Sequence, residues 1–217
     1  HVETKGRWDL VTEWDLAAER LIRQRVGEVT PRIPVVGEEE GGSPGAGPVW
    51  YADPIDGTTN YVHGHPFWCV SIGLVRDGEP LLGAVVAPAL GWEWWGRSDG
   101  AVHKNGVPCR VSATERIEEA LVATGFPRDR RVEPHNNFSS FINVKRVVSG
   151  VRRCGAAAID VCLVADGTYD GYWERRLNPW DLAAGAALVL GAGGRLSDLR
   201  CPPARIEAGQ VVAYNGR

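Results

Sequence analysis

Residues 53–60, with the sequence DPIDGTTN, combine two carboxylates with groups that can hold an anion. Hard divalent cations such as Mg²⁺ prefer carboxylate and carbonyl oxygens, which Asp53, Asp56 and the carbonyl group of Ile55 can supply. The proline between the two aspartates stiffens the turn. The backbone N–H groups that begin at Gly57, together with the threonine hydroxyls, suit phosphate. The segment therefore predicts metal ligands next to a phosphate-binding turn.

Two more acidic residues stand where predicted elements meet loops. Glu38 follows the apolar run 33–36, and Asp181 lies in the first turn of an apolar helix. Each feature alone has a structural explanation. Asp and Gly are ordinary turn residues, residues 38–40 can form a solvated loop, and an acid in the first turn complements the helix dipole. The combination of all four acids favours a metal site.

The first half of the chain predicts one helix followed by strands that pair in hairpins. Thr12 is the expected N-cap of the helix, and Glu19 precedes Arg23 by one turn. Asp77-Gly78 and Asn105-Gly106 are turn dipeptides typical of hairpins. The predicted elements are a helix from 12 to about 25, strands at 33–36 and 49–52, a glycine-rich loop at 41–48, and a hairpin formed by 67–75 and 81–86.

The second half predicts strands that alternate with helices. Asn178 can cap the last helix, Pro179 suits its first turn, and Gly193-Gly194 ends it. The body of this helix, 182–190, is apolar on every side, which is the pattern of a buried helix. The other predicted elements are strands at 122–124 and 168–173 and helices at 134–148 and 156–165. Hairpins followed by alternating elements indicate a mixed fold of the α+β class.

Composition and charge exclude several classes of protein. The 217 residues include 24 Lys and Arg against 27 Asp and Glu, so the net charge of −3 gives no basic surface for nucleic acid. No apolar run approaches the roughly 18 to 20 residues of a membrane span, so we expect no membrane partner and a cytoplasmic location. The five cysteines contain no Cys-x-x-Cys pair and are expected to be reduced thiols.

Three ordered blocks resemble the signature of the inositol monophosphatase family, whose members are Mg²⁺-dependent, lithium-sensitive phosphomonoesterases. The blocks are GEE at 37–39, DPIDGTTN at 53–60 and WDLAAG at 180–185, and the likeness spans nearly the whole chain. The resemblance implies the layered αβαβα sandwich of the inositol monophosphatase and sugar phosphatase type. It also implies a homodimer and a single catalytic domain, 1–217, with one subdomain at about 1–115 and another at about 116–217 that supplies Asp181 and the substrate residues.

The resemblance implies a site for two or three Mg²⁺ ions. Glu38, Asp53 and the Ile55 carbonyl would hold one ion, and Asp53, Asp56 and Asp181 would hold a second. A third, weaker ion would be associated with Glu38. Metals about 3.5 to 4 Å apart can stabilise both the attacking and the leaving oxygen of a phosphoryl transfer.

A catalytic sequence is also implied by the resemblance. Water activated by the metal would attack the phosphoryl group without a covalent enzyme intermediate. Glu38 and Thr58 would orient and deprotonate this water, and Asp15 would accept the hydroxyl proton of Thr58. Gly57 and Thr58 would bind the phosphate.

Substrate recognition is implied for Asp56, Asp181 and Glu174, the last of which matches an acid that binds an inositol hydroxyl in relatives. Gly155 and Ala156 occupy a place where relatives have Gly followed by Ser or Thr, so this chain lacks one side-chain hydroxyl there. The substrate implied is a small phosphate ester, namely inositol monophosphate or a similar polyol or sugar phosphate.

Alternatives remain open at this point. Relatives cleave histidinol phosphate, fructose 1,6-bisphosphate, NADP or 3'-phosphoadenosine 5'-phosphate by the same chemistry, and Arg152 and Arg153 can meet a second anionic group. A metal-dependent sugar-binding module is a different class, suggested by nine Trp residues, but it needs no phosphate-binding turn. Trp92, Trp94 and Trp95 are candidates for a contact between subunits, because aromatic residues are enriched in interfaces.

Overall fold

The computed structural model of the chain describes residues 2–6, 9–199 and 205–217, so Cys201 lies outside the described residues. The four described cysteines are free thiols, as the sequence predicts: Cys69, Cys109, Cys154 and Cys162. Within the described ranges, none of the helices combines the length and the apolar character that crossing a membrane requires.

The larger sheet has seven strands in the order β3-β4-β5-β6-β7-β8-β9. β3 runs parallel to β4, and every following neighbour in this sheet is antiparallel. The strands are β3 (Val35–Gly37), β4 (Pro48–Asp56), β5 (Cys69–Arg76), β6 (Glu79–Ala87), β7 (Trp92–Arg97), β8 (Val102–Lys104) and β9 (Val107–Cys109).

The smaller sheet has five strands in the order β11-β10-β12-β14-β13, in which β10 runs parallel to both of its neighbours. Its strands are β10 (Leu121–Thr124), β11 (Gly150–Arg152), β12 (Gly171–Arg175), β13 (Arg195–Ser197) and β14 (Gln210–Tyr214). A separate antiparallel pair consists of β1 (Val2–Gly6) and β2 (Asp9–Thr12).

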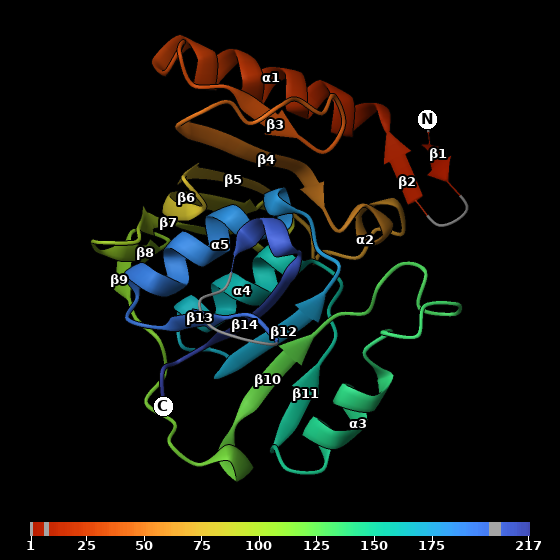
Figure 1. Cartoon of the computed structure of the whole chain (residues 1–217), viewed down its shortest axis with the longest axis vertical. Coiled ribbons are helices and arrows are strands. Elements are labelled where there is room, and N and C mark those ends of the chain that lie inside the picture. Colours follow the sequence, from red (N-terminus) through yellow and green to blue (C-terminus); the bar gives the residue numbers. More distant parts are fainter. Residues whose placement is uncertain (1, 7–8, 200–204) are drawn as a thin grey trace.

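Helices and sheets alternate in five layers (Figure 1). α1 covers the outer face of the larger sheet, α4 and α5 lie between the two sheets, and α3 lies on the outer face of the smaller sheet. This is the αβαβα sandwich that the resemblance implies. The helices are α1 (Glu13–Val29), α2 (Thr58–Val62), α3 (Phe138–Lys145), α4 (Ala157–Ala165) and α5 (Pro179–Gly191), with short 3₁₀ turns at η1 (Pro88–Leu90), η2 (Ile117–Glu119) and η3 (Ile206–Ala208).

The buried helix α5 carries an acidic residue to the edge of the larger sheet. Its body is buried between the sheets, which explains why it is apolar on every side. Gly73 and Gly83 on β5 and β6 face it, and a side chain at either glycine would overlap the backbone of Ala184. This close packing brings Asp181, in the first turn of the helix, next to the end of β4.

Several elements follow the local signals in the sequence. Thr12 caps α1 in a capping box with Asp15, and Asn178 caps α5 ahead of Pro179. The Asn105-Gly106 turn has positive φ at both residues, which is the geometry of a type I′ hairpin. These predictions of caps and hairpins are confirmed.

Several predicted elements differ from the structure in their bounds. The helix predicted to end at about Arg25 continues to Val29. The helix predicted at 134–148 is shorter, because Asn137 has a left-handed backbone with φ of 73° and precedes the first helical residue. The strand predicted to stop at Ala52 continues to Asp56. The strand predicted at 168–173 begins only at Gly171. Thr168, the first residue of the predicted strand, is instead in a turn, where its N–H donates to the Asp166 carboxylate.

The tryptophans near the second hairpin do not form one surface. Trp94 is fully buried, and its indole N–H donates to Asp166, so the predicted role of Trp94 in a subunit contact is wrong. Trp95 is 45% exposed and stacks on His103.

Candidate active site

Three carboxylates converge where β4 meets the N-terminus of α5. Oxygens of Asp53, Asp56 and Asp181 all lie within 4.8 Å of one another. Burial raises the pKa of each of these groups, and repulsion from Glu38, Asp56 and Asp181 raises the pKa of Asp53 further. Since such a set of hard oxygen donors is costly to bury while charged, its chemistry fits a divalent cation of the Mg²⁺ type.

An irregularity in β4 aims Asp53 and Asp56 at the same place. Residues three positions apart on a regular strand point to opposite faces of the sheet. Here Asp53 pairs with Ser71 and Asp56 pairs with Cys69, so β4 has one residue more than β5 across this stretch. This extra residue is a β-bulge, which brings both carboxylates to one side. Asp53 also accepts the N–H of Ile55 at 3.0 Å, which stabilises the bulge.

Each of the other two carboxylates is held by a helix N-terminus. Asp56 accepts the backbone N–H of Ala158, in the first turn of α4, at 2.7 Å, and this bond lowers the pKa that burial raises. Asp181 accepts the N–H of Asn178, the cap of α5, at 2.6 Å. Backbone N–H groups at the starts of the two central helices therefore fix these two carboxylates.

Glu38 lies beside this carboxylate triad, on the turn that follows β3. Its carboxylate lies 3.5 Å from the guanidinium group of Arg128 and is 11% exposed. Its backbone N–H donates to the carbonyl of Ala52, one residue before Asp53, at 3.3 Å. The charge of Glu38 raises the pKa of Asp53, although Glu38 is not one of the three carboxylates that lie within 4.8 Å of one another.

Thr58 and Asp15 meet although 43 residues separate them. The hydroxyl of Thr58 lies 3.1 Å from the Ile55 carbonyl and 3.5 Å from Oδ1 of Asp15. The other carboxylate oxygen of Asp15 accepts both the N–H and the hydroxyl of Thr12, at 2.7 and 2.5 Å. The capping box of α1 therefore holds Asp15 in position beside Thr58.

Position 57 requires glycine because of its backbone conformation and the atoms that surround it. Its φ is 91°, a conformation that residues with a side chain rarely adopt, and a Cβ atom would lie 3.1 Å from the Phe67 carbonyl and 3.2 Å from Cβ of Ala156. The chain can therefore turn sharply from β4 into α2 and pass close to the start of α4.

A cavity of about 730 Å³ opens beside these groups, within the size range of small-molecule sites. Acidic residues and arginines both line it. The lining residues include Asp56, Gly57, Thr58, Gly155, Ala156, Asp160, Glu174 and Asp181, together with Arg128, Arg130, Arg131, Arg153 and Arg176. The structure thus gathers the predicted phosphate and substrate residues around one space.

Glu174 is buried at the wall of this cavity. It accepts a hydrogen bond from the Tyr172 hydroxyl, and Gly125 packs so closely against its carboxylate that a side chain there would overlap it. Burial is the main reason why its pKa rises to about 7. Near neutral pH this carboxyl group can therefore either accept or donate a hydrogen bond.

Asp160 lines the cavity, although no motif in the sequence marks it as a site residue. It is buried on α4, and its Oδ1 atom has no hydrogen-bond partner among the described residues. Burial raises its pKa, followed by repulsion from Glu174 and Asp56. An acid within the otherwise apolar segment 156–165 was the available signal, but only the tertiary structure shows that it faces other acids.

Comparison with known proteins agrees with this arrangement. The model of the inositol monophosphatase family matches residues 1–217. An inositol-1-monophosphatase of Synechocystis sp. is 40% identical over 219 residues, which cover 100% of this chain and 76% of that protein. A fructose-1,6-bisphosphatase/inositol-1-monophosphatase of Aquifex aeolicus is 38% identical over 89% of this chain and 74% of its own length.

A solved structure supports the same relationship. The inositol monophosphatase of Anabaena (Nostoc) sp. superimposes with a TM-score of 0.90 at 38% sequence identity. The match covers 93% of this chain and 81% of the other.

Proposed function

Because the chain belongs to the inositol monophosphatase family and is therefore a phosphoric monoester hydrolase, we propose that it hydrolyses inositol monophosphate or a similar polyol phosphate with the help of Mg²⁺. The observation that carries this proposal is the convergence of Asp53, Asp56 and Asp181 beside a cavity of small-molecule size.

The metal site is proposed on the chemistry of its donors. Asp53, Asp56, Asp181, Glu38 and the Ile55 carbonyl would hold two or three Mg²⁺ ions, since all five offer hard oxygen atoms. When bound, the ions would neutralise phosphoryl oxygens and lower the pKa of water. The raised pKa values of the three aspartates support this assignment, because burial is the main reason for all three shifts and a bound cation would stabilise the charged forms that burial disfavours.

The protein's own residues would orient the nucleophile and receive its proton. The Thr58 hydroxyl would orient the attacking water together with Glu38, and Asp15 would accept the proton of that hydroxyl. The distance of 3.5 Å between Thr58 and Asp15 supports this relay. Backbone N–H groups at Gly57 and Thr58 would bind the phosphate, where the left-handed glycine exposes the start of α2.

The substrate hydroxyls would meet the acidic wall of the cavity. Asp56, Asp181 and Glu174 line it, and their oxygens can accept hydroxyl hydrogen bonds. Gly155 and Ala156 line the same wall without a side-chain hydroxyl, which leaves more room at this point than a Ser or Thr would.

Fructose 1,6-bisphosphate is a second candidate substrate, favoured by the arginines of the cavity. Arg130 and Arg153 line it, and a second phosphate group would suit their charge. The name of the Aquifex relative includes this activity. NADP and 3'-phosphoadenosine 5'-phosphate also carry further phosphate groups, so the name of that relative is what favours fructose 1,6-bisphosphate over them. Histidinol phosphate has no second phosphate for the arginines, and a sugar-binding role leaves the Thr58–Asp15 pair unexplained.

Further properties of the enzyme are part of the same proposal. We propose one catalytic domain, 1–217, in which about 1–115 supplies the metal and phosphate residues and about 116–217 supplies Asp181 and the substrate residues. We also propose inhibition by lithium, a homodimer, a cytoplasmic location, and no nucleic-acid or membrane partner.

A phosphate-release screen over the five substrates named above tests the proposed specificity. We expect the highest kcat/KM for inositol monophosphate. At about pH 8, where a carboxyl group with a pKa of about 7 is mostly ionised, Glu174→Gln should lower this value about tenfold, because it loses a charged hydrogen-bond acceptor. The substitution should have little effect on p-nitrophenyl phosphate, which has no polyol hydroxyl to bind. Glu79→Gln, an exposed acid on β6, is the matched control. Equal losses on both substrates in Glu174→Gln would contradict the proposed role.

A further inference from the structure

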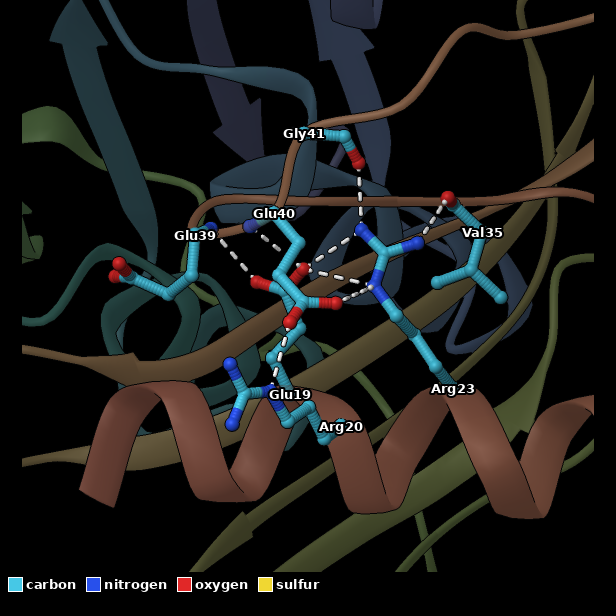
Figure 2. A network of polar contacts seen from close by, with 7 residues as sticks. All are labelled: Glu19, Arg20, Arg23, Val35, Glu39, Glu40 and Gly41. Carbon is cyan, nitrogen blue, oxygen red and sulfur yellow. Dashed lines mark hydrogen bonds and ion pairs between the residues drawn. The ribbon is translucent and has the colours of Figure 1, made fainter. Parts of the chain in front are cut away.

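A buried carboxylate lies behind the turn that carries Glu38. Glu19 is on α1, and its side chain is fully buried. Its Oε2 accepts the backbone N–H of Glu39 at 2.7 Å, and its Oε1 accepts the N–H of Glu40 at 3.0 Å. Figure 2 shows the Glu19 carboxylate, on the helix, pointing toward the turn above it. One side chain therefore holds the two residues that follow Glu38.

Arg23, one turn later on α1, completes this arrangement. Its guanidinium group donates to Oε1 of Glu19 through Nη2 at 2.7 Å and through Nε at 2.9 Å. It also donates to the carbonyl of Val35 at 2.8 Å and to the carbonyl of Gly41 at 2.6 Å (Figure 2). Arg23 thus connects the strand that enters the turn to the residue that leaves it.

The residue before Glu38 is held by packing. Gly37 lies against the Glu19 carboxylate, and a Cβ atom at Gly37 would overlap that group. Its own N–H donates to the Gly41 carbonyl at 3.0 Å. Backbone groups on both sides of Glu38 are therefore fixed, while the Glu38 carboxylate lies 3.5 Å from Arg128 and its charge raises the pKa of Asp53.

The hydrogen bonds explain how a buried charge is tolerated. An unpaired buried carboxylate is strongly destabilising, whereas Glu19 accepts four hydrogen bonds, two from backbone N–H groups and two from Arg23. Charge-assisted bonds of this kind are short and directional. Glu19 is not one of the described residues that line the cavity. It would therefore act through the turn and would not contact the substrate.

We propose that Glu19 and Arg23 are positioning residues, which hold the turn 37–41 so that Glu38 is oriented for metal binding before an ion arrives. The proposal rests on the proposed function, in which Glu38 is a metal ligand. Groups that orient a ligand in this way commonly change metal affinity by about 10- to 100-fold when they are replaced.

The test compares Glu19→Gln and Arg23→Lys with Arg20→Gln, each in the full chain. Arg20 lies on the same helix, is 68% exposed and pairs with the side chain of Glu40 at 2.8 Å (Figure 2). Mg²⁺ affinity is measured by calorimetry without substrate, and the exchange rates of the Glu39 and Glu40 amides are measured by NMR in EDTA. Thermal unfolding monitors the folded state.

We expect Glu19→Gln to weaken Mg²⁺ binding about tenfold or more. It should also accelerate exchange of at least one of the two amides, because they bond to different carboxylate oxygens and glutamine keeps only one of these oxygens. Arg23→Lys should produce a smaller change in the same direction, and Arg20→Gln should produce neither. Folded Glu19→Gln or Arg23→Lys protein with wild-type Mg²⁺ affinity would overturn the proposal. Arg23→Lys keeps the positive charge and therefore carries the test if Glu19→Gln does not fold.

Glu38→Gln distinguishes a failure of the positioning role from a failure of the assignment of Glu38 as a metal ligand. If Glu38→Gln weakens Mg²⁺ binding and the variants at Glu19 and Arg23 do not, the positioning role is wrong while the proposed function stands. If Glu38→Gln binds Mg²⁺ as tightly as the wild type, the assignment of Glu38 as a ligand is wrong, and the positioning role falls with it.

Discussion

Replacing Asp53 by Asn removes one of three negative charges from a buried site while keeping the shape of the side chain. The amide oxygen can still accept the N–H of Ile55, which Asp53 accepts at 3.0 Å. No cavity is created, so the change in stability reports mainly on charge. We expect Asp53→Asn to stabilise the metal-free protein and to remove most of the stabilisation that Mg²⁺ provides.

The magnitude follows from the spacing of the oxygens. At the 4.8 Å that bounds this spacing, two full charges in a medium of dielectric constant about 20 repel each other by about 3 kcal/mol. Partial protonation of the triad reduces this value. We therefore expect the free energy of unfolding of Asp53→Asn in EDTA, at about pH 8, to exceed that of the wild type by about 1 to 3 kcal/mol.

The sign of the pH dependence follows from the pKa of Asp53. Burial raises this pKa first, and the charges of Glu38, Asp56 and Asp181 raise it further. A carboxyl group whose pKa is higher in the folded state stabilises the fold when protonated, and this contribution is lost as the pH rises above the unfolded value. The advantage of Asp53→Asn should therefore be larger at about pH 8 than at about pH 5.

Urea unfolding followed by tryptophan fluorescence provides the assay, with and without saturating Mg²⁺. A ligand at 100 times its dissociation constant stabilises a protein by about 2.7 kcal/mol, and the wild type should gain an amount of this order. Asp53→Asn should gain much less. A variant that is less stable than the wild type in EDTA at alkaline pH, and gains as much from Mg²⁺, would refute the electrostatic account of the site.

Three further substitutions test individual parts of the structure. Gly57→Ala should lower the free energy of unfolding by about 1 to 2 kcal/mol because of the left-handed backbone, and by a further amount because the new Cβ atom would crowd its neighbours. Gly64→Ala is the control, because Gly64 has a φ of 68° but open space around it, and it should show the backbone cost alone. Equal losses in the two variants would contradict a packing role for Gly57. Asp160→Asn should stabilise the protein in EDTA, more at about pH 8 than at about pH 5, because burial raises the pKa of Asp160. A larger gain in the free energy of unfolding by urea at about pH 5 would contradict this raised pKa. Thr58→Ala should lower kcat by about 100-fold or more with little change in the free energy of unfolding. Thr168→Ala, an exposed threonine that is not part of the cavity lining, should retain activity, and normal kcat in Thr58→Ala would exclude the proposed relay.

The sequence predicts those features of the fold that depend on neighbouring residues. The caps at Thr12 and Asn178 are visible because a capping box needs only four consecutive residues. The hairpin at Asn105-Gly106 can be predicted because both residues of this turn need a positive φ, and few residue types other than Asn and Gly adopt it. The five-layer sandwich was instead implied by the resemblance of the ordered motifs to a known family, and the combination of the four acids favoured one metal site.

Features that depend on distant partners were not predictable in the same way. The common direction of Asp53 and Asp56 arises from a bulge, which exists only in the register with β5. The spacing of Glu19 and Arg23 indicates an ordinary ion pair on a helix, whereas the structure shows both side chains bonded to a turn about 20 residues away. The sequence around Trp94 suggests a surface residue, whereas in the folded protein Trp94 on β7 is fully buried.

The dependence of phosphate release on Mg²⁺ tests the central claim most directly. Wild-type protein is assayed on inositol monophosphate with Mg²⁺, after addition of EDTA, and after Mg²⁺ is restored in excess, beside Asp181→Asn under the same conditions. We predict that EDTA abolishes phosphate release by the wild type, that Mg²⁺ restores it, and that Asp181→Asn stays inactive although folded. Undiminished release in EDTA, or normal turnover by Asp181→Asn, would contradict the metal-dependent mechanism.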